Sequence, residues 1–171
     1  TEFCLTTTSG GQALQLALRA VGVKPGTKVL ANAYTLAPVP GAIHAAGGEP
    51  ILVEIDKNWH TDIEDLRAKA ASRGARYLML SHMRGHIAQT YKHINSGEGG
   101  LLTTNDAELA SRAVVISGSY MNYAAHGAIP DEEVFRQTRL ESPNCSARMD
   151  NLRAALIRAQ LPMLEDNVRR W

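Results

Sequence analysis

The chain has 171 residues, of which 44% are hydrophobic, and this composition fits one globular domain with a buried core and excludes a disordered chain. Its 18 Lys and Arg residues nearly balance its 17 Asp and Glu residues, giving a formal net charge of +1. No overall field therefore exists to attract nucleic acid or an anionic membrane, and we expect neither as a partner.

The cysteine pattern and the N-terminus give expectations about location. Cys4 and Cys145 are the only cysteines and are far apart, which argues against a disulfide framework and against a zinc site. A reducing cytoplasm is the simplest location. No apolar run approaches the length of a membrane span, and the first residues lack the features of a signal peptide. The chain also begins without Met, which suggests a start inside a longer gene product.

Helix and strand signals alternate in the first half of the chain. Apolar residues at helical spacing predict a helix over about 11–21 and another over 38–48. A third helix is predicted over 61–74, with Thr61 as its N-cap. Short apolar runs predict buried strands, at 28–33, 50–55 and 75–82. This alternation predicts an α/β domain of three layers, α/β/α, with a mostly parallel sheet covered on both faces.

The second half continues with the same two kinds of signal. Apolar runs predict strands at 100–104 and 114–118. Between them, a helix is predicted over 105–113 with Asn105 or Asp106 as its cap, and another helix over 131–140. A long helical rhythm covers 148–169 and is interrupted at Pro162, where a kink is expected.

One lysine, Lys92, stands five residues before the run Gly97-Glu98-Gly99-Gly100. Glycine-rich backbone lets N–H groups approach an anion closely, and a lysine beside it supplies either a counter-charge or a nucleophilic amine. The first use is typical of phosphate cradles and the second of imine chemistry. Taken alone, Lys92 is more simply an exposed lysine in a polar loop, so this position by itself does not decide between them.

Four stretches together resemble a known family. They are "TSGGQALQLAL", "KPGTKVLANAYTLAPVPGAIHAAGGEPILVEID", "KHINSGEGGLLTTNDAELASRA" and "RMDNLRAALIRAQLPML". In this order they are similar to motifs of the DegT/DnrJ/EryC1/StrS family of sugar aminotransferases, which depend on pyridoxal 5′-phosphate (PLP). The resemblance implies the large domain of fold type I, the aspartate aminotransferase class. It identifies residues 1–171 as one PLP-binding domain.

The resemblance also implies roles for particular residues. Lys92 is the expected catalytic residue, forming the Schiff base with PLP and moving the proton during transamination. Related dehydratases carry histidine at this position, so lysine favours transamination. Gly10 and Gly11 are expected to bind the PLP phosphate at a helix N-terminus, with Ser9 supplying the hydroxyl that the family's Thr would provide at position 11. Leu36 is expected to cover the cofactor ring.

Several alternatives stay open within that resemblance. Tyr34 could replace Leu36 at the face of the ring. Asn144 is the candidate for the family Asn that reaches the partner subunit's cofactor, although direct counting places that Asn on Ser146, and this role implies a homodimer with shared active sites. His82 and His86 are spaced i, i+4, but Gly85 argues against the helix that a metal pair would need. No metal site is expected.

The chain departs from the family pattern between 88 and 89, where the family has several tens of additional residues. These would include the Asp that pairs with the pyridine nitrogen and a Ser that binds the phosphate. The small C-terminal domain of the family is also expected to be largely absent after Trp171. We expect that the sequence omits segments of the working protein, since loss of a central strand would expose a large apolar surface.

The resulting functional hypothesis is a PLP-dependent aminotransferase of sugar biosynthesis. It would move an amino group from an amino acid, such as glutamate, to a keto group of a nucleotide-linked sugar or related polyol. Two alternatives belong to other classes. One is a shortened, non-catalytic relative that acts as a dimeric binding or regulatory module, and the other is a phosphate-binding α/β domain that uses its glycine turns without PLP.

Overall fold

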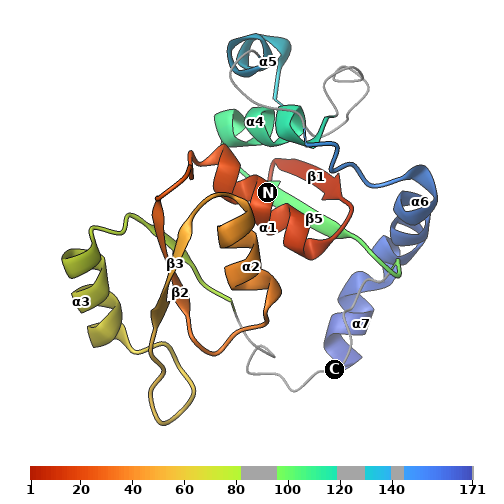
Figure 1. Cartoon of the computed structure of the whole chain (residues 1–171). Coiled ribbons are helices and arrows are strands. Elements are labelled where there is room, and N and C mark those ends of the chain that lie inside the picture. Colours follow the sequence, from red (N-terminus) through yellow and green to blue (C-terminus); the bar gives the residue numbers. More distant parts are fainter. Residues whose placement is uncertain (82–95, 119–129, 140–144, 171) are drawn as a thin grey trace. The chain divides into compact units, whose positions relative to one another are not determined.

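The computed structural model describes residues 1–81, 96–118, 130–139 and 145–170. The chain divides into two compact units. The first unit joins Thr1–Val21 with Tyr91–Trp171, and the second unit is Gly22–Thr90. Both are α/β structures (Figure 1).

The second unit is built on a three-stranded parallel sheet of order β3-β2-β4. The strands are β2 (Lys28–Asn32), β3 (Glu49–Val53) and β4 (Tyr77–Met79). Helices α2 (Pro38–Ala45) and α3 (Ile63–Arg73) both contact β3 and β2 and lie on opposite sides of these strands in Figure 1. The predicted parallel sheet with helices on both faces is therefore present in this unit.

Helix α3 shows why its sequence forms a helix at this place. Asp62 is the N-cap, and its carboxylate accepts hydrogen bonds from the N–H groups of Glu64 (2.9 Å) and Asp65 (3.1 Å). The expectation that Thr61 caps this helix is therefore wrong, because the carboxylate one residue later reaches both amides. The helix ends at Gly74, whose φ of 63° is in the left-handed region that glycine adopts readily.

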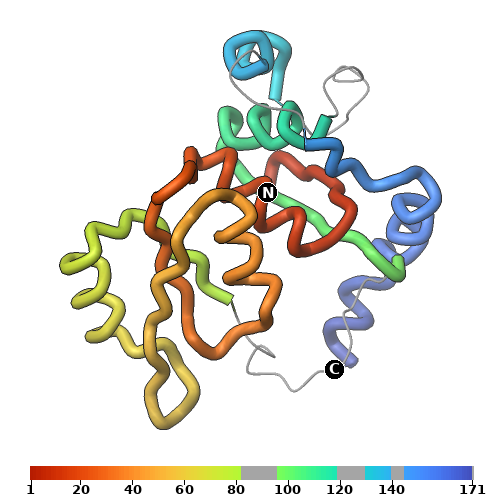
Figure 2. The backbone as a smooth tube through the Cα atoms, in the orientation of Figure 1, coloured from red at the N-terminus to blue at the C-terminus, as the bar shows by residue number. Residues whose placement is uncertain are grey.

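The first unit contains the other sheet and most of the helices. Strands β1 (Phe3–Thr7) and β5 (Gly100–Thr104) lie side by side (Figure 2). They pair antiparallel, with Phe3 opposite Thr104 and Thr7 opposite Gly100. Helices α1 (Gly10–Ala20) and α4 (Ala107–Ser117) pack against each other and against these strands. The remaining elements are α5 (Glu132–Thr138), α6 (Asn151–Gln160), the 3₁₀ turn η2 (Leu161–Met163) and α7 (Leu164–Arg170).

Two predictions about strands need correction. The strand predicted at 114–118 is wrong, because α4 continues through Ser117 and ends at Gly118. Its run Val114-Val115-Ile116 is buried around the helix rather than alternating, and a short apolar run does not distinguish a buried strand from a buried helix. Strand β1 was not predicted, and its antiparallel pairing with β5 departs from the expected mostly parallel arrangement.

Pro162 lies where the sequence predicted an interruption. Helix α6 ends at Gln160, the 3₁₀ turn contains Pro162, and α7 begins at Leu164. The proline has no N–H to continue the helical ladder. Across the described residues, no helix combines the length and apolar character that a membrane crossing requires.

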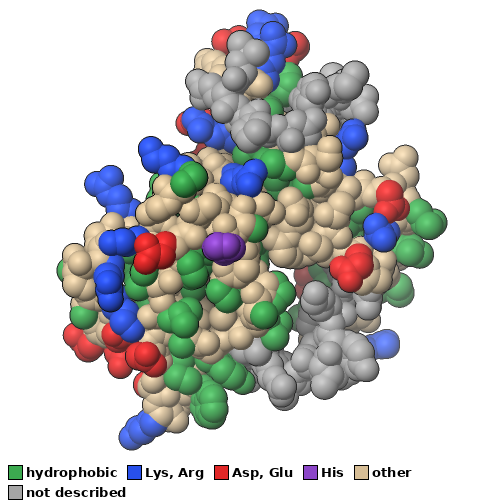
Figure 3. All heavy atoms as spheres, viewed as in Figure 1, with side chains coloured by type: hydrophobic (Ala, Val, Ile, Leu, Met, Phe, Trp, Pro, Cys, Tyr) green, Lys and Arg blue, Asp and Glu red, His purple; other side chains and the backbone are tan. Residues whose placement is uncertain are grey.

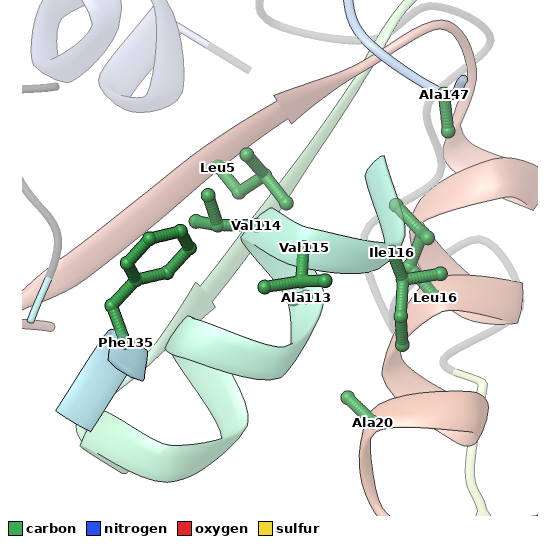
Figure 4. Close-up of a cluster of buried hydrophobic side chains, with 9 residues drawn as sticks. All are labelled: Leu5, Leu16, Ala20, Ala113, Val114, Val115, Ile116, Phe135 and Ala147. Carbon is green, nitrogen blue, oxygen red and sulfur yellow. The ribbon is translucent and has the colours of Figure 1, made fainter. Parts of the chain in front are cut away.

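The core of the first unit forms where α1 and α4 face β1. It contains nine buried residues: Leu5, Leu16, Ala20, Ala113, Val114, Val115, Ile116, Phe135 and Ala147 (Figure 4). Leu16 and Ala113 are both fully buried. The small alanines let the two helices approach closely, and the branched residues fill the space between helix and strand.

Leu16→Ala should lower the free energy of unfolding by roughly 2–5 kcal/mol, because it removes buried methyl groups and leaves a cavity. Chemical denaturation followed by circular dichroism measures this loss. Leu152→Ala is the control, since Leu152 is 73% exposed and its change should stay within about 0.5 kcal/mol. Equal effects of the two substitutions would contradict the described packing.

Candidate functional site

The turn Ser9-Gly10-Gly11 begins helix α1. The Ser9 hydroxyl oxygen accepts a hydrogen bond from the N–H of Gln12 at 3.1 Å and so caps the helix. Its own proton stays available for a second partner. The N–H groups of Gly10 and Gly11 make no hydrogen bond to any described residue, since they precede the first intrahelical bond, which runs from Ala13 to Ser9. The helix dipole adds partial positive charge at the same point.

The glycine run before β5 lies directly against this turn. A Cβ atom on Gly100 would meet the carbonyl group of Ser9 and would come within 2.7 Å of the Thr7 hydroxyl. Thr7 is fully buried, and its hydroxyl donates to the Ser9 carbonyl at 2.9 Å. Pairing of β1 with β5 therefore brings together the two glycine motifs that the sequence separates by some 85 residues. Only glycine leaves room for this approach.

Gly99 is restricted for a second reason. Its φ is 159°, and a Cβ atom would come within 2.6 Å of Met149 Cε and 2.8 Å of Ser96 Oγ. Met149 is buried and lies just before helix α6. Gly100 thus packs against the Ser9 turn, and Gly99 packs against Met149, just before α6.

Residues 145–149 form a third segment beside the turn. Ala147 accepts a hydrogen bond from the N–H of Thr8 at 3.2 Å and donates its own N–H to Ser117 at 2.9 Å. Ser146 is exposed and has a φ of 49°. Asp150 then caps α6, and the backbone N–H of Arg153, followed by the charge of that residue, holds the pKa of the Asp150 carboxyl below its usual range. Ser146 therefore belongs to a segment whose backbone is hydrogen-bonded to Thr8, the residue before Ser9.

Two expected site residues lie outside the described part of the chain. Lys92 and Asn144 fall within 82–95 and 140–144, and so do His82 and His86 within the first of these ranges. Their roles stay predictions. Within residues 1–81, 96–118, 130–139 and 145–170, no three His, Cys, Asp or Glu side chains gather in a way that could hold a metal ion.

The second unit carries Leu36 on the loop after β2. Leu36 is 60% exposed, so its side chain is accessible to a ligand. The Tyr34 ring instead contacts the Trp59 ring, with centroids 4.9 Å apart. Of the two alternatives for covering the cofactor ring, Leu36 has the more accessible side chain.

A buried amide that the sequence analysis did not single out holds this loop. Asn32 is the last residue of β2 and is 5% exposed. Its amide nitrogen donates to the carbonyl oxygens of Tyr34 (2.7 Å) and Ser81 (3.1 Å), and its oxygen accepts from the N–H of Ser81 (3.0 Å). The Ser81 hydroxyl also contacts the Thr35 hydroxyl. A polar residue at the end of a predicted buried strand was the available signal, because ligands of parallel sheets bind at these ends.

The family model described as "DegT/DnrJ/EryC1/StrS aminotransferase family" matches residues 1–90 and 89–170. The chain belongs to this family. The resemblance inferred from the four sequence motifs is thereby confirmed.

Two curated relatives illustrate the similarity. The chain is 27% identical to a dTDP-3-amino-3,6-dideoxy-alpha-D-galactopyranose transaminase from Aneurinibacillus thermoaerophilus, over 99% of this chain and 55% of the relative. It is 24% identical to the GDP-perosamine synthase of Escherichia coli O157:H7, over 99% of this chain and 56% of the relative. The chain thus spans about half the length of the curated relatives it matches.

A solved structure shows the fold. A crystal structure of a DegT DnrJ EryC1 StrS aminotransferase from Brucella abortus matches with a TM-score of 0.67 and 20% identity, over 95% of this chain and 54% of that chain. The expected fold, that of the fold type I PLP-dependent transferases, is confirmed at this level.

Gly100→Ala should lower the free energy of unfolding by roughly 1–3 kcal/mol, because the new methyl group overlaps the Ser9 carbonyl and the Thr7 hydroxyl. Gly41→Ala is the matched control. Gly41 lies inside α2 and a Cβ there meets nothing within 4 Å, so this change should be neutral or stabilising. Thermal or urea denaturation compares the two, and a stable Gly100→Ala protein would contradict the close approach.

Asn32→Ala should cost roughly 1–3 kcal/mol for each partner left unsatisfied, the Ser81 N–H and the Tyr34 carbonyl being the main ones. Denaturation again measures the loss, and increased proteolysis within 33–37 should accompany it. Asn58→Ala serves as the control because Asn58 is exposed. If both substitutions left the loop equally protected, Asn32 would not be what holds it.

Proposed function

We propose that the protein of which this chain forms part is a PLP-dependent aminotransferase that acts on a keto group of a nucleotide-linked sugar. An amino acid such as glutamate is the amino donor. Family membership over residues 1–90 and 89–170 is the observation that carries this proposal. The names of the relatives support the substrate class, since one is a transaminase of a dTDP-linked amino sugar and another is GDP-perosamine synthase. The non-catalytic alternative is not favoured by these relatives.

The residues at the start of α1 fit the phosphate group of PLP. Two N–H groups without a described protein partner, a hydroxyl proton on Ser9 and the positive end of a helix dipole are the features that bind phosphate at helix N-termini. Gly11 offers its N–H but no hydroxyl, so Ser9 supplies the side-chain donor. Leu36 covers the cofactor ring in this proposal.

Bound PLP supplies an electron sink that makes the proton on the donor's α-carbon removable. Lys92 holds the cofactor through its amine and, once released, moves that proton as a general base and acid. This task needs a neutral amine, which confinement in the site favours. Asn144, or Ser146 in its place, reaches the cofactor of a partner subunit, so the working protein is a homodimer. Its proposed location is the cytoplasm.

The group that would pair with the pyridine nitrogen is assigned to no residue of this chain. We propose that the working protein has further residues between 88 and 89, and that the chain represents its large PLP-binding domain. Two observations support this. The two matches to the family model meet at residues 89–90, and the alignment with the A. thermoaerophilus relative extends over 215 positions although the chain has 171 residues.

Borohydride reduction of the purified protein in the presence of PLP, followed by intact mass and peptide mapping, tests the proposal. We expect one pyridoxyl group on the Lys92 peptide and none in Lys92→Ala. Lys57→Ala is the control, because Lys57 is an exposed loop lysine outside the proposed site, and it should label like the parent protein. Absence of the adduct, or labelling spread over several lysines, would overturn the aminotransferase assignment.

A further inference from the structure

A hollow of about 310 Å³ lies in the second unit at the edge where the parallel strands begin. Its lining includes Lys28, the first residue of β2, and Arg76, which precedes β4. Arg73, in the last turn of α3, completes a group of three cationic side chains. Asn32 and Ser81 lie at the opposite ends of the same strands, so this hollow is separate from the loop that carries Leu36.

The three cations of the hollow differ from the two remaining basic residues of α3, Arg67 and Lys69, in having no described acidic partner. Arg67 pairs with Glu64 at 2.8 Å, and Lys69 pairs with Asp65 at 2.7 Å. In contrast, Lys28, Arg73 and Arg76 make no ion pair and no side-chain hydrogen bond with any described residue. Figure 3 shows both basic and acidic side chains on the face of the molecule that it presents. The end of α3 therefore presents positive charge that nothing described neutralises.

No carboxylate of a described residue lines the hollow. Its other lining residues are Gly26, Thr27, Gly74 and Tyr77. The nearest acid by strand register is Glu49, which pairs with Lys28 in the sheet but is exposed and does not line the hollow. Since the whole chain has a formal charge of only +1, this positive charge is local, and it favours an anion at this hollow.

Two backbone N–H groups at the hollow are already used in other hydrogen bonds. The N–H of Gly26 donates to Gly47 at 3.1 Å, and the N–H of Gly74 donates to Ala70. An anion would therefore be held by side chains. Two guanidinium groups and one ammonium group suit phosphate oxygens, and arginine binds them in a bidentate manner. The volume is at the small end of the range of about 300–1,000 Å³ for small-molecule pockets.

We propose that the hollow formed by Lys28, Arg73 and Arg76 is a second anion site that binds a diphosphate group, distinct from the proposed PLP phosphate turn at Ser9. Three cations match the charge of a diphosphate better than that of a single phosphate. The site acts through charge and side-chain donors, without a metal and without a covalent step. It does not depend on the aminotransferase assignment.

Isothermal titration calorimetry of the whole chain with inorganic pyrophosphate, in the presence of saturating PLP to occupy the Ser9 turn, tests the site. We expect saturable binding that weakens at least tenfold in the double variant Lys28→Ala, Arg76→Ala. The charge-preserving pair Lys28→Arg, Arg76→Lys should retain binding within a few-fold. Arg67→Ala is the control, because it removes a cation of α3 that is already paired.

The same titration with a nucleoside diphosphate distinguishes the two possible sources of the diphosphate group, a diphosphate ester and free pyrophosphate. Tighter binding than pyrophosphate identifies an ester as the ligand, and weaker binding identifies free pyrophosphate, both in support of the site. Three outcomes would overturn it: equal affinity of the parent and the double alanine variant, equal loss in Arg67→Ala, or sulfate binding as tightly as pyrophosphate. Circular dichroism of each variant shows that it is folded, and a misfolded double variant is replaced by the single variants.

Discussion

The contact between Gly100 and the Ser9 carbonyl is the constraint on which the candidate site depends. Because β1 and β5 pair antiparallel with Thr7 opposite Gly100, the end of one strand must pass directly beside the turn that opens α1. Any side chain at position 100 would occupy the place of the Ser9 carbonyl. The buried Thr7 hydroxyl donates to that carbonyl, so the Ser9 carbonyl is held at the start of the turn whose Gly10 and Gly11 N–H groups have no described partner.

In the second unit, a buried polar side chain, Asn32, holds the loop after β2 in place. Asn32 is buried at the end of β2, and an amide there is tolerated only because its donors and its acceptor are all used. The result is a loop that is fixed at Tyr34 and Thr35 and accessible at Leu36. Steric exclusion at Gly100 and hydrogen-bond satisfaction at Asn32 thus place two predicted cofactor contacts, each within its own unit.

Charge is distributed unevenly although the chain is almost neutral. Acids occupy the first turn of α3, where Asp62 caps the helix, and one cation, Arg73, occupies its last turn. Each end complements the helix dipole. The dipole alone accounts for a cation such as Arg73, but not for Lys28, which begins β2, or for Arg76, which precedes β4, although both line the same hollow. This convergence from different elements is what favours a ligand over a helix-end effect.

The sequence alone determined where most of the helices lie, because their 3.6-residue periodicity and their terminal glycines are local signals, and ordered motifs determined the family. It also determined strands such as 28–32 and 100–104 as short apolar runs. It did not determine that Val114-Val115-Ile116 is helical, since such a run suits either structure until the contact with Leu16 and Leu5 decides. Strand β1, the approach of Gly100 to Ser9 and the grouping of Lys28 with Arg76 join residues far apart in the chain. Only tertiary packing could decide them, because no local signal encodes which distant backbone lies alongside.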